Sequence, residues 1–197
     1  MRIIGGRLGG ARFKGPPDRV TRPTPDRVRE GLASILEARA ALKGAAVLDL
    51  FAGTGALSFE ALSRGAARAV AVDKDRRAIR AIAEVAKKFG IECKIEILRL
   101  DLLREPIFAA ERILRTGYGP FDLVFADPPY RYINALPGLF DALAQRKILS
   151  ETSLIVIEHA TKQPPSEHLK LDPIASYRYG DTTLAILRSQ GAREEFS

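Results

Sequence analysis

The pattern of apolar and polar positions alternates between short apolar runs and amphipathic segments, which is typical of an α/β fold around a parallel sheet. The first amphipathic segment is predicted to be a helix that begins at Thr24 and Pro25, which fit an N-cap and a first turn, and ends before Gly44. Strands and helices are then predicted to alternate, beginning with a strand, at residues 45–50, 56–64, 69–72, 76–89, 94–100, 107–115, 121–126, 136–143 and 154–158.

The two ends of the chain depart from this alternation. Residues 174–179 and 182–187 are predicted to form two strands around a tight turn at Gly180, so an antiparallel hairpin is expected at one edge of the sheet. A second hairpin is predicted within residues 1–13, and a stiff proline-rich connector over residues 16–25 follows it. We expect three parts: a basic hairpin arm at residues 1–23, one α/β domain at residues 24–190 and a disordered tail at residues 191–197.

The composition is that of a globular protein, because 46% of the 197 residues are hydrophobic and 28% are charged. One cysteine and two histidines are too few for an intramolecular disulfide or a structural zinc site. No apolar run approaches the roughly 20 residues that a membrane helix needs. We therefore expect a cytoplasmic monomer that binds no metal and has no membrane anchor.

Positive charge is concentrated near the N-terminus. The formal net charge is +7, and residues 1–30 hold eight basic and three acidic residues, so they carry +5 of it. A basic segment on a nearly neutral body fits a nucleic-acid-binding protein, because cations that contact phosphates release condensed counterions. The alternative is a solvated face with an arginine excess. The candidate nucleic-acid-binding residues are Arg2, Arg7, Arg12, Lys14, Arg19, Arg22 and Arg27.

Four predicted strands end at an aspartate or run directly into one: Asp49, Asp73, Asp101 and Asp127. In an open parallel sheet, ligands bind beyond the carboxyl ends of the strands, near the point where the strand order reverses, so these side chains are expected to line one crevice. The alternative role for each aspartate is to cap the helix that follows it. The shared spacing of Asp49 and Asp73 favours a ligand, whereas for Asp101 the two roles stay open.

The loop from Asp49 to Gly55 is the predicted centre of a cofactor site. Its glycines permit close approach of the backbone to a ligand, but Ser58 stands where a dinucleotide fingerprint needs a third glycine or alanine. Asp49 can pair with a cationic amino group, Asp73 can accept two ribose hydroxyls, and Asp101 can accept an adenine amine. S-adenosylmethionine, a nucleoside that bears an amino acid and no phosphate, fits this set. The predicted cofactor-binding residues are Asp49, Phe51, Ala52, Gly53, Thr54, Gly55, Asp73, Lys74, Asp101 and Leu102.

The segment Asp127-Pro128-Pro129-Tyr130 follows an apolar strand and is predicted to be catalytic. The two prolines form a rigid bend, and both of their carbonyls are expected to be open to a substrate. An exocyclic amine of a nucleobase is a poor nucleophile, and hydrogen bonds to the Asp127 carboxylate and the Pro128 carbonyl would orient it for attack. Tyr130 offers a ring on which the base can stack. The alternative is a structural turn, with Asp127 as a cap and Tyr130 covering the core.

These motifs closely resemble those of class I S-adenosylmethionine-dependent methyltransferases, in particular the RsmD family of bacterial 16S rRNA guanine-N2 methyltransferases. The resemblance covers nearly the whole chain and is carried by residues 2–6, 21–24, 26–30, 49–57, 72–73, 127–130 and 179–182. It implies a Rossmann-like, mostly parallel sheet of seven strands with one antiparallel strand and helices on both faces. It also implies methylation of the exocyclic N2 amine of one guanine in 16S rRNA, expected at position 966, in an assembly intermediate of the small subunit.

Three other functions are compatible with parts of the sequence. A DNA or RNA methyltransferase acting on adenine N6 or cytosine N4 would use the same chemistry, although no additional segment is long enough to read a DNA sequence. A nicotinamide-dependent oxidoreductase would share the sheet but would leave the Asp127–Tyr130 motif unexplained. An RNA-binding module without catalysis would explain the basic segment alone. His159, which follows the fifth predicted strand, is expected to pack or face solvent.

Overall fold

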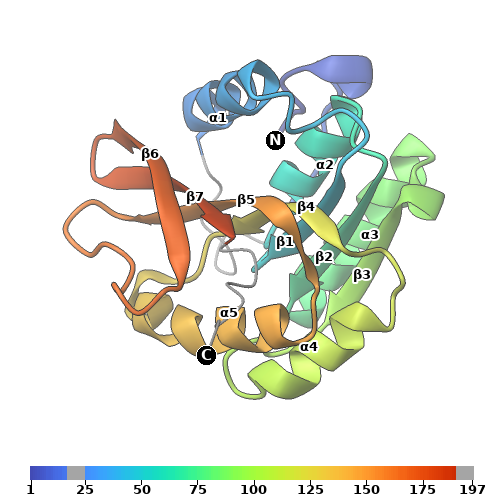
Figure 1. Cartoon of the computed structure of the whole chain (residues 1–197). Coiled ribbons are helices and arrows are strands. Elements are labelled where there is room, and N and C mark those ends of the chain that lie inside the picture. Colours follow the sequence, from blue (N-terminus) through green and yellow to red (C-terminus); the bar gives the residue numbers. More distant parts are fainter. Residues whose placement is uncertain (17–24, 190–197) are drawn as a thin grey trace.

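The computed structural model describes residues 1–16 and 25–189, which are organised around one mixed sheet (Figure 1). Its strands are β1 (Ala46–Leu50), β2 (Arg68–Asp73), β3 (Ile95–Arg99), β4 (Phe121–Ala126), β5 (Leu149–Ala160), β6 (Leu171–Tyr179) and β7 (Thr182–Ser189). The α-helices of this part of the chain are α1 (Asp26–Ala38), α2 (Ala56–Ser63), α3 (Arg76–Phe89), α4 (Pro106–Leu114) and α5 (Leu136–Gln145). Short 3-10 helices are η1 (Gly6–Leu8), η2 (Glu92–Lys94) and η3 (Tyr130–Ala135).

The strand order across the sheet is β3-β2-β1-β4-β5-β7-β6. Strands β1 to β5 pair in parallel, and β7 lies antiparallel between β5 and β6. This confirms the expected seven-stranded sheet with one antiparallel strand. After β3 the chain returns to the other side of β1, so the strand order reverses between β1 and β4. Ligands of such sheets bind beyond the carboxyl ends of the strands at this reversal.

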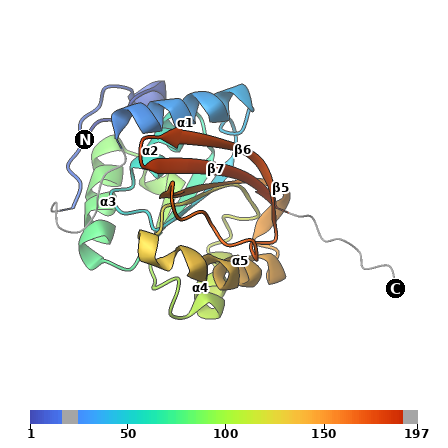
Figure 2. The ribbon, with the colours of Figure 1, turned by 90° about the vertical axis from the view of Figure 1, so that its left-hand side faces the viewer.

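Helices cover both faces of the sheet, with α1, α2 and α3 on one side and α4 and α5 on the other (Figure 2). Successive side chains of a strand point to opposite faces. In β1, Val47 therefore belongs to the hydrophobic cluster beneath α1–α3, while Leu48 and Leu50 belong to the cluster beneath α4 and α5. Because both faces are buried, the central strands are apolar along their length, as parallel strands generally are.

The N-terminal residues belong to the hydrophobic core. Ile3 and Phe13 are almost fully buried, and the Phe13 ring meets Phe59 of α2 and Phe89 of α3 edge to face, with ring centroids 5.5 and 6.3 Å away. Edge-to-face aromatic pairs add to the stabilisation that burial of the rings gives. Residues 1–16 are thus anchored on α2 and α3.

The predicted N-terminal hairpin is formed only in part. Residues 1–13 fold back on themselves, but strand pairing is limited to one antiparallel bridge between Arg2 and Arg12, with η1 at the turn. The buried carboxylate of Glu60 on α2 instead accepts the backbone N–H groups of Ile4 and Gly5, at 2.9 and 3.0 Å. These contacts satisfy backbone donors that a longer hairpin would use, which is why a short bridge replaces the expected strands.

Several element boundaries also differ from the predicted ones. Helix α1 ends at Ala38, before the expected stop at Gly44, because Ala40 adopts a left-handed conformation with φ of 53°. Pro25 occupies the N-cap position, and Thr24 lies outside the described residues. Strand β5 begins at Leu149, where a polar stretch before the apolar run pairs with β4 across a register shift. Strand β6 begins three residues earlier than predicted.

Candidate active site

A cavity of about 510 Å³ lies at the carboxyl ends of the central strands, where the strand order reverses. All four strand-terminal aspartates, Asp49, Asp73, Asp101 and Asp127, line it. So do residues of the loop after β1 and of the segment after β4. The volume is in the range of small-molecule and cofactor pockets. The structure therefore brings the two predicted motifs together in one site.

The loop after β1 turns sharply around the cavity through left-handed residues. Phe51, Gly53 and Gly55 have φ of 63°, 53° and 73°. A side chain at Gly55 would also collide with the Phe59 ring, since a Cβ there would lie 2.9 Å from it. Glycine at position 55 is thus required by both conformation and space, and it lets α2 begin directly at the cavity.

Asp73 links the loop after β1 to the loop after β2. Its Oδ2 accepts the backbone N–H of Gly53 at 2.8 Å, and its Oδ1 accepts that of Asp75 at 2.8 Å. The N-cap of α3 is Asp75, whose carboxylate accepts the N–H of Arg77, so Asp73 does not cap that helix. A carboxylate has about four acceptor positions, which leaves capacity on both oxygens toward the cavity.

Asp49 is buried and bonded to the first turn of α2. Its Oδ2 accepts the backbone N–H of Ser58 at 3.1 Å and the Ser58 hydroxyl at 2.6 Å. Ser58, the residue that breaks the dinucleotide fingerprint, therefore has a structural partner. Burial raises the pKa of Asp49 to about 7, although the Ser58 hydrogen bonds lower it. A cation in the cavity would favour the ionised carboxylate.

Asp101 and Leu102 form a partly open wall of the cavity. Asp101 Oδ1 accepts long hydrogen bonds, 3.4 Å each, from the backbone N–H groups of Leu103 and Arg104, and Oδ2 lies 4.0 Å from Lys74 Nζ. Helix α4 starts at Pro106, after Glu105, so Asp101 does not occupy its N-cap. Leu102 is buried and presents an apolar surface beside it. This pairing of an acceptor with an apolar side chain is compatible with a purine ring that carries an amine.

The predicted catalytic segment lines the cavity after β4, the strand that pairs with β1. Asp127 follows the last residue of β4, and burial together with the charges of Glu158 and Asp49 raises its pKa well above the usual range. Tyr130 is 36% exposed, and its hydroxyl lies 3.2 Å from Thr182 Oγ1. The Pro129 carbonyl accepts the N–H of Tyr132 at 2.8 Å, which fills one of its two acceptor positions.

Several cavity residues were not singled out from the sequence. These are Glu158 in β5, Tyr132 in η3, Thr182 at the start of β7, and Pro25 and Leu57. Glu158 ends the predicted strand at residues 154–158 and is acidic like the four aspartates, so the same rule could have found it. The neighbouring His159 is buried, its Nδ1 lies 2.8 Å from the Ala160 carbonyl, and it does not line the cavity.

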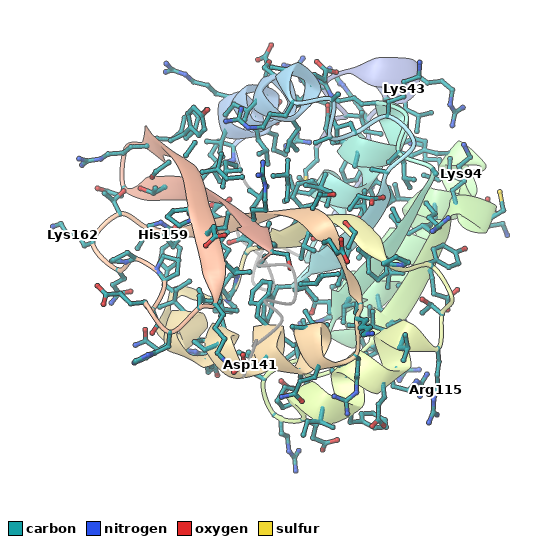
Figure 3. All side chains as sticks on the ribbon, viewed as in Figure 1. Lys43, Lys94, Arg115, Asp141, His159 and Lys162 are labelled. Carbon is teal, nitrogen blue, oxygen red and sulfur yellow. The ribbon has the colours of Figure 1, made fainter. Side chains whose placement is uncertain are left out.

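The candidate nucleic-acid-binding residues have different surroundings. Arg7, Arg12, Lys14 and Arg27 are exposed, and Arg2 forms an ion pair with Asp26 at 3.0 Å. Arg19 and Arg22 lie outside the described residues. Cations such as Lys43, Lys94 and Arg115 also project from other parts of the surface (Figure 3), so exposure alone does not separate a binding face from a solvated one.

Residues 1–16 and 25–189 contain no cluster of metal-ligating side chains and no helix that could cross a membrane. Every helix in these ranges is too short or too polar to do so.

Comparison with known proteins identifies the family. The sequence model of the family described as Conserved hypothetical protein 95 matches residues 1–188. The ribosomal RNA small subunit methyltransferase D of Escherichia coli K12 is 35% identical over 158 residues, which cover 80% of this chain and 74% of that protein. Among solved structures, yhhF of Escherichia coli has a TM-score of 0.78 at 27% identity, with 97% of this chain and 98% of that chain covered.

The fold is shared more widely. An RNA methyltransferase from Salinibacter ruber, solved in complex with S-adenosyl-L-homocysteine, has a TM-score of 0.62 at 19% identity, with 88% of this chain and 97% of that chain covered. The chain therefore belongs to the family described as Conserved hypothetical protein 95, the RsmD family, and is an S-adenosylmethionine-dependent methyltransferase.

Proposed function

We propose that this protein methylates the exocyclic N2 amine of a guanine in 16S rRNA of the small ribosomal subunit. The target implied by the family resemblance is guanine 966. The observation that supports the proposal is the common cavity, which is lined both by the Asp127–Tyr130 segment and by the loop and aspartates of the proposed cofactor site. The name of the Escherichia coli relative supports ribosomal RNA as the substrate. We place the reaction in the cytoplasm, on an assembly intermediate of the subunit, with the protein acting as a monomer.

The cavity residues fit S-adenosylmethionine. When bound, this cofactor supplies a methyl group on a sulfonium centre. Asp73 would accept the ribose hydroxyls, Asp49 would pair with the ammonium group, and Asp101 with Leu102 would hold the adenine. Among the described residues that line the cavity, Lys74 is the one lysine or arginine, which makes the wall acidic. An acidic wall suits a cationic ligand and opposes the pyrophosphate of a nicotinamide dinucleotide.

The segment after β4 would position the amine. The carboxylate of Asp127 and the carbonyl of Pro128 would accept its two N–H groups, which directs the nitrogen lone pair toward the cofactor side of the cavity. Nitrogen must lose one proton for each methyl group gained. The raised pKa of Asp127 makes its carboxylate a competent acceptor for that proton. The Tyr130 ring, at the rim, would stack on the extruded base.

The N-terminal segment would bind the RNA backbone near the cavity. Arg7, Arg12 and Lys14 are exposed on it, and the segment reaches the cavity rim at Gly15, where an added Cβ would lie 3.0 Å from Thr54. Thr54 itself lines the cavity. Phosphate contacts from these cations would orient the RNA without reading its sequence.

Methyl transfer to defined nucleic acids tests the proposal. Purified protein is incubated with methyl-labelled S-adenosylmethionine and small-subunit particles, protein-free 16S rRNA or DNA, and the labelled nucleosides are identified by mass spectrometry. We expect N2-methylguanosine in the small-subunit RNA. Asp127→Ala should be inactive, while Asp122→Ala, at the other end of the same strand, should be active. Label in adenosine, cytidine or DNA would show that the proposed substrate is wrong.

A further inference from the structure

Resting on the proposed function, we propose that Glu158 selects guanine by accepting the N1–H of the target base while Asp127 accepts from its N2 amine. Glu158 would be a specificity-determining residue in the methyltransferase site. Glu158 and Asp127 follow directly on paired strand positions and line the same cavity, and guanine carries adjacent donors on its Watson–Crick edge.

The backbone positions of Asp127 and Glu158 follow directly on a paired position of two neighbouring strands. Strands β4 and β5 pair in parallel with Ala126 opposite Ile157, so Asp127 and Glu158 are the next positions on the two strands. Both residues are half-buried and line the cavity. On its other side, Glu158 lies opposite Leu184 of β7. Because Glu158 lies within β5 and pairs with β7, it is held more rigidly than a residue in a loop, as specific recognition requires.

Guanine presents two adjacent donors on its Watson–Crick edge, the N1–H and the N2 amine. Adenine and cytosine instead present an amine next to a ring nitrogen that is an acceptor. Two neighbouring carboxylates match the donor pair of guanine. The same pair would place a carboxylate against the ring acceptor of adenine or cytosine, leaving both groups without a donor in a partly buried site. This arrangement favours guanine and disfavours the other amine-bearing bases.

The electrostatics of the free site agree with this geometry. Burial, and then the charge of Glu158, raise the pKa of Asp127, so the two carboxylates interact in the absence of substrate. Like charges oppose each other, and a ligand with two adjacent donors would relieve the repulsion. Lys74, the cation of the cavity wall, is engaged elsewhere, with its Nζ 4.0 Å from Asp101 and 5.5 Å from the centre of the Tyr132 ring.

The test replaces the N1–H of the target base. Small-subunit rRNA is assembled by ligation with either guanine or 2-aminopurine at the target position and reconstituted into particles. 2-Aminopurine keeps the amine but has an acceptor at N1. Glu158→Gln keeps the size of the side chain and gains a donor that suits this acceptor. Glu151→Gln, on the exposed beginning of the same strand, is the matched control.

The measured quantity is the ratio of kcat/KM for guanine to kcat/KM for 2-aminopurine. We expect the wild-type protein and Glu151→Gln to prefer guanine strongly, and Glu158→Gln to lower the ratio about 10-fold or more, as expected for one base-reading hydrogen bond. Loss of the O6 atom in 2-aminopurine affects all proteins alike. A change in Asp127 ionisation affects both substrates alike. Neither the missing O6 atom nor Asp127 ionisation therefore changes the difference in this ratio between the wild-type protein and Glu158→Gln.

Two results would overturn the role of Glu158, and only the second would also overturn the proposed function. If Glu158→Gln binds S-adenosylhomocysteine normally and lowers both rates equally, Glu158 does not read N1, while the proposed function stands. If the wild-type protein methylates neither particle, the proposed function fails and the inference fails with it. Recovery of 2-aminopurine methylation in Glu158→Gln alone would support the assignment.

Discussion

Replacement of Asp73 tests the cofactor side of the site. Asp73→Ala removes the carboxylate proposed to accept two ribose hydroxyls, and it also removes the acceptor of the Gly53 and Asp75 backbone N–H groups. Hydrogen bonds to a charged group contribute about 1.5–3 kcal/mol each and are not additive, so we expect a total loss of about 2–4 kcal/mol of cofactor binding. This corresponds to a dissociation constant raised about 30- to 1,000-fold.

The control for the lost backbone contacts is Asp122→Ala. Asp122 accepts the backbone N–H of Ala46 at 2.9 Å, at the other end of the sheet and outside the cavity. Each unpaired N–H should cost about 1 kcal/mol of stability, so the two variants should both be destabilised. Only Asp73→Ala should lose affinity for the cofactor.

Calorimetry distinguishes a loss of ribose recognition from a loss of affinity caused by a misplaced loop. The protein is titrated with S-adenosylhomocysteine and with its analogue that lacks the ribose 2′-hydroxyl. The wild-type protein should bind the deoxy analogue more weakly than the parent compound. Asp73→Ala should bind both weakly and with nearly equal affinity. Unchanged affinity of a folded Asp73→Ala protein for S-adenosylhomocysteine would refute the role assigned to this carboxylate.

Three further predictions concern other parts of the molecule. In single-turnover methylation, Tyr130→Phe should keep most of the activity, although it loses the hydroxyl contact to β7, and Tyr130→Ala should be inactive. If both variants were inactive, the hydroxyl would be essential. The pKa of Asp49 is raised to about 7, so the folded protein holds this proton more tightly than the unfolded chain and its stability falls as pH rises from about 4 to 7. In urea unfolding between pH 5 and pH 8, Asp49→Asn should remove up to roughly 3 kcal/mol of this decrease. The same pH dependence in the variant and the wild-type protein would contradict this prediction. Changing Arg7, Arg12 and Lys14 to glutamine should reduce the log–log salt slope of RNA binding by up to about 2 without changing cofactor affinity, and an unchanged slope would mean a solvated face.

Most of the sheet and much of the site follow from local sequence signals. The apolar runs of β1 and β4 are long enough to identify as buried strands, and the parallel arrangement brings Asp49, near the end of β1, and Asp127, directly after β4, to one edge. Glu158 was missed because it was counted as the last residue of the predicted strand at residues 154–158. The adjacent pairing of β4 and β5, which makes it a neighbour of Asp127, is a property of the tertiary fold.

The N-terminal segment shows where sequence patterns fail. Ile3 and Phe13 are single apolar residues among glycines and arginines, so no periodicity indicates that they enter the core. Their position depends on Glu60, which accepts backbone N–H groups more than fifty residues away along the chain. Contacts at such separation leave no local signal, and the segment was therefore predicted as a separate hairpin arm.

Mass mapping of 16S rRNA tests the central claim most directly. Nucleosides are analysed from cells that lack this protein and from the same cells supplied with the wild-type protein, Asp127→Ala or the control Asp122→Ala. We predict that one N2-methylguanosine is absent without the protein, returns with the wild-type protein and with Asp122→Ala, and stays absent with Asp127→Ala. An unchanged set of methylated guanosines in 16S rRNA across all four samples would contradict the proposed function.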